Sequence, residues 1–94
     1  MTHRLYIVTY DISAPKRWRR VFAHLHELGE HRQLSVFLVR TNARGLARLA
    51  ARLEGLIDPK TDSILIAPVG RGEGDRMVEL GVPGPNPGAQ LVIF

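Results

Sequence analysis

Apolar positions in the first third of the chain change from strand-like to helix-like spacing. The run Leu5–Tyr10 is short, β-branched and aromatic, which is typical of a strand. The next segment places apolar side chains at helical spacing as far as Gly29. Ser13 is the N-cap candidate for this helix, and Pro15 suits its first turn. The pattern therefore predicts a strand followed by an amphipathic helix.

The middle of the chain repeats this order, with one ambiguity. His31–Arg40 is strand-like but long, and it contains no Asn-Gly or Asp-Gly turn. Two strands broken near Ser35 and one bent strand are both open. Thr41 and Asn42 are capping residues for a second helix, which we expect Asp58-Pro59 to stop. The apolar face of this helix consists of Leu46, Leu49, Ala50, Leu53, Leu56 and Ile57.

The last third combines apolar runs with a loop-rich linker. Ser63–Val69 is apolar enough to predict a central strand. Residues 70–90 contain six glycines and three prolines, so we expect a linker in which only Arg76–Leu80 forms a short strand. The apolar tail 91–94 should be buried, and the linker lets it reach a second subunit. We therefore expect a swapped terminal strand in a homodimer.

The order of these elements predicts the fold class. A strand, a helix, one or two strands, a second helix and a strand form the split β-α-β pattern of a ferredoxin-like sandwich, an α+β fold. Both helices would then cover one face of the sheet. We expect residues 1–94 to form one domain.

Composition narrows the chemistry that this domain can carry. Cysteine is absent, which excludes disulfides, thiolate metal sites and iron-sulfur clusters. Any metal must therefore bind oxygen or imidazole. No apolar run approaches the ~18 residues that a membrane span needs, so we expect a cytoplasmic protein. Phosphate-cradling glycine motifs are also absent, which argues against nucleoside triphosphate chemistry.

Positive charge gathers in the first half of the chain and predicts a nucleic-acid partner. Residues 1–53 contain ten basic and three acidic residues, and eleven of the thirteen cations in the whole chain are arginines. The arginine fork suits phosphate oxygens. Arg44, Arg48 and Arg52 follow one another at i+4 spacing on the second helix, where like charges disfavour the helix. Phosphates along this arginine stripe and a merely solvated face are both open.

A second basic cluster opens the first helix, close behind a candidate catalytic carboxylate. We interpret Lys16 and Arg20 as solvated, but four cations at a helix N-terminus suggest a nearby anion. Asp11 ends the first strand, where it is either a functional carboxylate or a turn former. One carboxylate is too few for a metal cage. A dimer axis near Asp11 would supply two, which is enough for Mg²⁺ with its waters.

Four short segments stand out by their order and spacing: YIVTYDIS at Tyr6–Ser13, KRWRR at Lys16–Arg20, QLSVF at Gln33–Phe37 and DSILIAPV at Asp62–Val69. Taken together they resemble the CRISPR-associated Cas-two family, and the resemblance extends over nearly the whole chain. Members of that family are ferredoxin-like homodimers that pair with an integrase subunit during the capture of foreign DNA. Several are metal-dependent endonucleases.

The resemblance implies a catalytic set at the end of the first strand. Tyr10 and Asp11 match the strand-end pair of the family, with Asp11 as the Mg²⁺ ligand that faces its twin across the dimer. Ser35 and Phe37 match an element whose serine and aromatic ring lie near the same cleft.

The resemblance also implies basic residues beside this set. Arg17 and Arg19 match nucleic-acid-binding positions of the family. The chain departs from the family at His31, where arginine is common, although Arg32 follows directly. The identity of the cation near the site is therefore open.

Two functions fit these observations. The first is a Mg²⁺-dependent endonuclease of CRISPR adaptation that acts on the phosphodiester bonds of RNA or DNA. The second is a non-catalytic dimeric adaptor that binds DNA and bridges integrase subunits. A ligand-binding regulatory domain and a ribonuclease toxin of similar fold are further alternatives. The sequence does not separate these functions.

Overall fold

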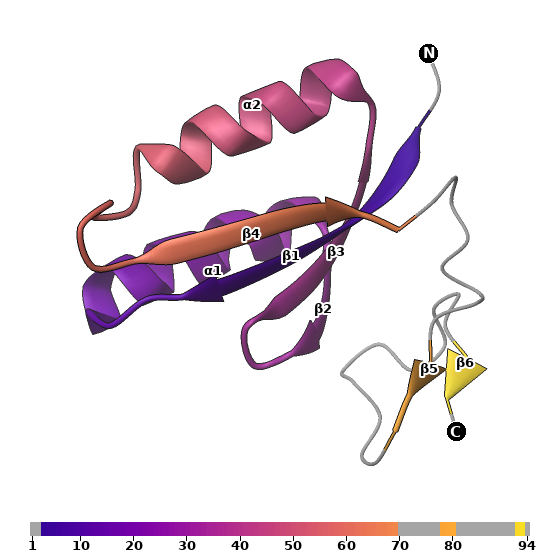
Figure 1. The fold of residues 1–94 in the computed structure, drawn as a ribbon, viewed down its shortest axis with the longest axis horizontal. Helices are drawn as coiled ribbons and strands as arrows, with labels where there is room; N and C mark the ends of the chain where they lie inside the picture. Colours follow the sequence, from indigo (N-terminus) through magenta and orange to yellow (C-terminus); the bar gives the residue numbers. More distant parts are fainter. Residues whose placement is uncertain (1–2, 70–77, 81–91, 94) are drawn as a thin grey trace.

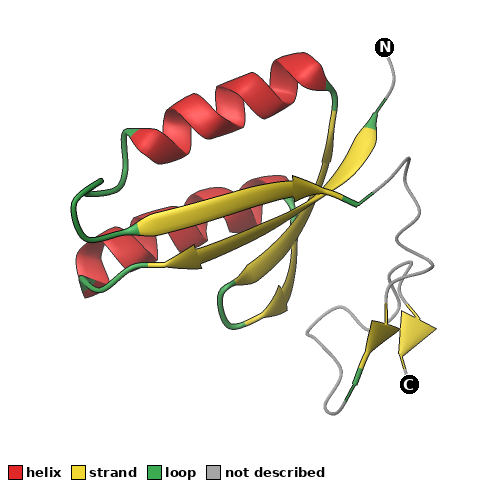
Figure 2. Ribbon diagram, viewed as in Figure 1, coloured by secondary structure: helices red, strands yellow, loops and turns green. Residues whose placement is uncertain are grey.

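A four-stranded antiparallel sheet carries two helices on one face in the computed structural model, which describes residues 3–69, 78–80 and 92–93 (Figure 1). The strand order β2-β3-β1-β4 is that of a ferredoxin-like α+β fold, as the sequence predicts. Figure 2 distinguishes the helices, in red, from the strands, in yellow. The elements are β1 (Arg4–Asp11), α1 (Pro15–Leu28), β2 (Glu30–Gln33), β3 (Val36–Thr41), α2 (Ala43–Glu54), β4 (Ser63–Pro68), β5 (Val78–Glu79) and β6 (Val92–Ile93).

The central strand β1 divides its side chains between the helix-covered face and the open face of the sheet. Successive residues of a strand point to opposite faces. Val8 and Tyr10 are therefore buried under the helices, whereas Thr9 and Asp11 lie on the open face. The core under the helices consists of Val8, Tyr10, Ile12, Val21, Leu25, Phe37, Val39, Leu49 and Leu53.

The segment after α1 forms two strands, which resolves the ambiguity of the sequence pattern. β2 ends at Gln33, and β3 begins at Val36 after a turn at Leu34 and Ser35. The pairing register shifts between His31 and Gln33, which marks a β-bulge in β2. The predicted break near Ser35 is therefore confirmed.

The ends of the helices correct two expectations. Ala14, and not Ser13, is the N-cap of α1, because the residue before Pro15 is restricted to the extended backbone that an N-cap adopts. Asn42 caps α2 as predicted, since its Oδ1 accepts a hydrogen bond of 2.9 Å from the backbone N–H of Gly45. α2 ends at Glu54, four residues before Asp58. Leu56 and Ile57 pack against the core from beyond the helix end.

Strand β4 lies at an edge of the four-stranded sheet, so the prediction of a central strand is wrong. β4 pairs with β1 alone within the described residues, and its Pro68 is tolerated at such an edge. An apolar run does not distinguish a central strand from an edge strand. In β4 the apolar side chain of Leu65 is 62% exposed.

The short strands near the C-terminus pair with each other in the same chain. Val92–Ile93 of β6 runs parallel to Val78–Glu79 of β5. Most of the glycine- and proline-rich linker 70–90 lies outside the described residues, so the swap of residues 91–94 onto a second subunit stays a prediction. No helix among the described residues is long and apolar enough to span a membrane.

Gly29 permits α1 to lie close to β3, and its replacement should destabilise the fold. A Cβ atom at Gly29 would overlap the carbonyl oxygen of Leu38 and lie 2.8 Å from Cγ2 of Val39. We expect Gly29→Ala to lower the free energy of unfolding by about 1–3 kcal/mol, because a backbone carbonyl cannot move aside cheaply. Gly55→Ala is the matched control, since its Cβ would lie 3.6 Å from the nearest atom.

Urea unfolding of the two variants measures this difference. Equal midpoints for Gly29→Ala and the wild-type protein would show that the helix can shift away from the strand without cost.

Candidate functional site

A shallow depression of about 470 Å³ lies where β1, the β2–β3 turn and β4 meet. Asp11 at the end of β1 pairs in register with Ser63 at the start of β4, so both side chains lie on the open face. The turn is joined to β1, because the backbone N–H of Tyr10 donates to the carbonyl of Ser35 at 3.2 Å. The depression is lined by Thr9, Tyr10, Asp11, Ser35, Val36, Ser63, Ile64 and Leu65.

Tyr10 and Phe37, which the sequence groups with Asp11, lie mainly in the core below the depression. The ring of Tyr10 is 6.3 Å from that of Phe37, and Phe37 is fully buried. The hydroxyl of Tyr10 donates to the carbonyl of Leu34 at 3.4 Å, which helps to hold the turn that presents Ser35. Burial raises the pKa of Tyr10 to about 12, so the phenol is protonated at neutral pH. Of these four residues, Asp11 and Ser35 therefore present polar side chains to the depression, and the two aromatic rings pack below them.

An ion pair between Arg17 and Asp62 joins α1 to the loop before β4. Nε of Arg17 lies 2.7 Å from Oδ2 of Asp62, and Nη2 donates to Oδ1 at 3.4 Å and to Thr61 Oγ1 at 3.3 Å. The backbone N–H of Asp58 donates to the same carboxylate at 2.9 Å. The Asp62 side chain is fully buried, and Ser63 follows it directly. This ion pair thus holds the start of β4 beside Asp11.

The hydrogen bonds at Asp62 also set its protonation. The hydrogen bond from Arg17, followed by that from the backbone of Asp58, lowers the pKa of Asp62 to about 2. The same hydrogen bond raises the pKa of Arg17. Sequence reasoning placed Arg17 beside a nucleic acid and missed Asp62. The only local signal was an acidic residue directly before an apolar strand.

The other predicted cations are exposed. Arg19 lies exposed on α1, and Arg44, Arg48 and Arg52 lie exposed along α2. The structure therefore places these side chains where a large anion could reach them. Their binding to phosphate stays a prediction.

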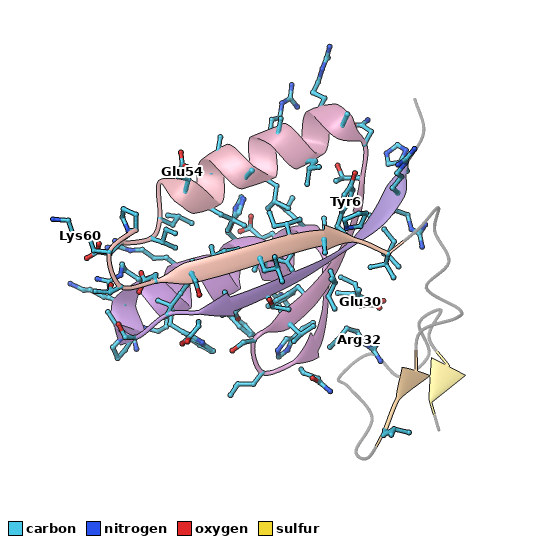
Figure 3. All side chains as sticks on the ribbon, in the orientation of Figure 1. Tyr6, Glu30, Arg32, Glu54 and Lys60 are labelled. Atoms are coloured by element: carbon cyan, nitrogen blue, oxygen red, sulfur yellow. The ribbon has the colours of Figure 1, made fainter. Side chains whose placement is uncertain are left out.

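His31 and Arg32 occupy different surroundings on β2. The ring of His31 stacks on Phe37 at 4.7 Å, and its Nε2 is buried without a hydrogen-bond partner in the described part of the chain. Arg32 is 3% exposed and lies 3.7 Å from the carboxylate of Glu30 (Figure 3). Arg32 is thus held in an ion pair on its own strand.

The oxygen groups around Asp11 suit a hard cation. Asp11 is the charged member, and Ser35 and Ser63 add hydroxyls to the same depression. Mg²⁺ prefers oxygen ligands and keeps several waters, so it needs one or two carboxylates together with substrate phosphates. Among the described residues, no three His, Asp or Glu side chains gather to hold a metal. One chain thus offers one carboxylate to such a cation.

The strand order, the two helices and the acidic residue at the end of β1 define a small ferredoxin-like domain with a candidate site at one end of its sheet. Residues 4–77 match the family model of the CRISPR associated protein Cas2. The chain belongs to this family.

Curated relatives and solved structures agree with this assignment. The chain is 44% identical over 68 residues to a CRISPR-associated endoribonuclease Cas2 of Rhodospirillum rubrum, covering 72% of this chain and 67% of the relative. It is 38% identical to that of Geobacter sulfurreducens, covering 73% of each. The structure of Streptococcus pyogenes Cas2 at pH 6.5 is similar with a TM-score of 0.75 and 33% identity, covering 82% of this chain and 99% of that one. The structure of the hypothetical protein TT1823 from Thermus thermophilus is similar with a TM-score of 0.76 and 38% identity, covering 86% of this chain and 94% of that one.

The lowered pKa of Asp62 predicts a pH-dependent contribution to stability. The folded-state pKa of about 2 lies below the ordinary value of 3.8. The stabilisation that the ionised carboxylate gives the fold is therefore complete at pH values above 3.8. This contribution is lost as the pH falls through about 2. We expect Asp62→Asn to lower the melting temperature at pH 7, and the difference from the wild-type protein to shrink progressively below pH 4.

Thermal unfolding between pH 7 and pH 2 measures this effect, with Glu54→Gln on the exposed face of α2 as the control (Figure 3). A difference that stays constant down to pH 2 would contradict the role of the Asp62 carboxylate.

Proposed function

We propose that this protein is a metal-dependent endonuclease that cleaves the phosphodiester bonds of RNA or DNA during CRISPR adaptation. The observation that carries the proposal is the exposed carboxylate of Asp11 in a depression that also presents Ser35 and Ser63. Membership of the Cas2 family and relatives named endoribonucleases support it.

Asp11 is the residue that would hold Mg²⁺, together with waters and phosphate oxygens of the substrate. The bound ion would neutralise charge on the scissile phosphate and lower the pKa of a water ligand. The chain's own part is to present the carboxylate at a fixed place. Pairing of Asp11 with Ser63, and the ion pair of Arg17 with Asp62, hold that place. Arg19 is exposed and would contact the phosphates that flank the cleaved bond.

A homodimer would complete the site. Leu65 is 62% exposed on the open face and lines the depression beside Asp11, which favours cover by a second copy of this face. Such packing would bring a second Asp11 toward the first and supply the second carboxylate. The dimer would then offer one shared cation site and two basic surfaces for nucleic acid and an integrase subunit.

A non-catalytic adaptor is the second candidate function, and one observation favours it. Each chain supplies a single carboxylate, with no cluster of three metal-binding side chains in the described ranges. An adaptor needs the basic surfaces and the dimer but no cation. Cleavage with and without Mg²⁺ separates the two functions.

We expect Asp11→Asn to reduce Mg²⁺-dependent cleavage by on the order of 100-fold or more, because it removes the charge that holds the cation while nearly keeping the shape. Dimerisation and nucleic-acid affinity should stay close to those of the wild-type protein. The assay follows cleavage of labelled RNA and DNA with Mg²⁺ and with EDTA. Glu54→Gln, which loses an exposed carboxylate on α2, is the control.

Two results would contradict the endonuclease. Normal cleavage by Asp11→Asn would place any nuclease activity elsewhere. Cleavage by neither protein, with nucleic-acid binding intact, would favour the adaptor.

The arginine stripe on α2 predicts salt-dependent binding to nucleic acid. Replacing Arg44, Arg48 and Arg52 with glutamine should lower the slope of log affinity against log salt concentration, by about 0.9 for each duplex phosphate that the protein no longer neutralises. Fluorescence anisotropy at several salt concentrations measures the slope. An unchanged slope would mean that the stripe is only a solvated face.

A further inference from the structure

A groove runs between α1 and α2 on the side of the domain away from the open face of the sheet. Two hollows of about 440 and 460 Å³ lie between these helices, and both are lined by His24 and Arg52. The first is also lined by Leu28 and Arg48, and the second by Arg20. The helices follow antiparallel strands and therefore run antiparallel (Figure 1). The two hollows are neighbours, because they share His24 and Arg52. We call them together the interhelical groove.

The wall of the interhelical groove is strongly basic. Arg20 of α1 and Arg52 of α2 line one hollow, and Arg48 and Arg52 line the other. Glu27 is the acidic side chain among the lining residues of the two hollows. Within the described part of the chain, none of these three arginines takes part in a salt bridge. In the sequence, Arg20 belongs to the basic cluster of the first helix, apart from the arginine stripe of the second. The fold brings Arg20 beside Arg52 of that stripe. An anionic occupant would relieve their mutual repulsion.

The floor of the groove is apolar, which narrows the kind of anion. Leu28, which is 49% exposed, and the buried Leu49 line the first hollow, and the half-buried Leu56 lines the second. A basic rim over an apolar floor suits a ligand with both phosphates and uncovered base faces, as in single-stranded nucleic acid. In a duplex the base faces are stacked and would not reach this floor. Successive arginines of α2 are about 6 Å apart along its axis, a spacing that an extended phosphate backbone can follow.

We propose that the interhelical groove binds single-stranded nucleic acid, with phosphates on Arg20, Arg48 and Arg52 and bases against the leucine floor. This inference rests on the proposed function and deepens it. The start of α1 and the end of α2 lie at the same end of the domain as Asp11 (Figure 1). A nucleic-acid strand in the groove would thus leave it at the end of the domain that carries Asp11 on the opposite face.

Binding of labelled oligonucleotides of about 12 nucleotides tests the groove. RNA, single-stranded DNA and a duplex of the same sequence are compared by fluorescence anisotropy over a range of salt concentrations. Arg20→Gln and Arg52→Gln should each lower the slope for both single strands by about 0.7. Lys60→Gln, which removes the same charge from an exposed loop, should leave the slope unchanged. Leu28→Ser should weaken single-strand binding severalfold at an unchanged slope.

Arg44 distinguishes the groove from the stripe. Arg44 belongs to the stripe but does not line the groove, whereas Arg20 lines the groove but lies outside the stripe. The groove therefore predicts a larger effect of Arg20→Gln than of Arg44→Gln on single-strand affinity. The reverse order would overturn the groove.

Further outcomes decide against the proposal. Equal slopes for Arg20→Gln and Lys60→Gln would overturn it. So would a decrease in duplex affinity on Arg20→Gln that is as large as the decrease in single-strand affinity. Displacement of the oligonucleotide by poly-glutamate at equal charge concentration would overturn it in favour of an acidic protein segment. Circular dichroism checks that each variant is folded.

The groove and the endonuclease can fail separately. Suppose that the groove variants bind single strands normally and that the wild-type protein shows Mg²⁺-dependent cleavage that Asp11→Asn removes. These results would overturn the groove proposal and leave the endonuclease proposal standing. Groove variants that no longer bind, in a protein that does not cleave, would support the groove and overturn the endonuclease.

Discussion

The ion pair between Arg17 and Asp62 is the interaction on which the candidate site depends. It joins the first turn of α1 to the loop before β4, and these segments are 45 residues apart. The Asp62 carboxylate is fully buried, so removing Arg17 would leave a buried charge without its ion-pair partner. Because Ser63 follows Asp62 and pairs with Asp11, the ion pair sets the edge of the depression. Arg17 therefore contributes to the candidate site through the fold, and its contact with nucleic acid stays a prediction.

The alternation of side chains along β1 places core residues and exposed polar residues on opposite faces of the sheet at this edge. Tyr10 and Asp11 are neighbours in the chain, but one belongs to the core and the other to the open face. The aromatic ring of Tyr10 rests on Phe37, and its hydroxyl holds the turn that carries Ser35. The result is an exposed carboxylate on a rigid base, which is what a fixed cation ligand requires.

The sequence predicted what depends on local periodicity and missed what depends on contacts between distant residues. The strand before Asp11, both helices and the break near Ser35 follow from residue spacing, and all were confirmed. The edge position of β4 and the partner of Arg17 depend on how distant segments meet, which spacing does not contain. The N-cap at Ala14 was missed because the restriction imposed by Pro15 outweighed the capping preference of Ser13. Arg20 was grouped with solvated residues because only the packing of α1 beside α2 places it in a groove.

The proposed activity requires that two Asp11 carboxylates share one cation at the axis of a dimer. Titration with Mn²⁺, followed by electron paramagnetic resonance of the free ion, tests this requirement most directly. At concentrations where sedimentation shows a dimer, we expect one tight Mn²⁺ site per two chains, which Asp11→Asn removes while the dimer persists. One site per chain, or a tight site that survives in Asp11→Asn, would contradict the shared site.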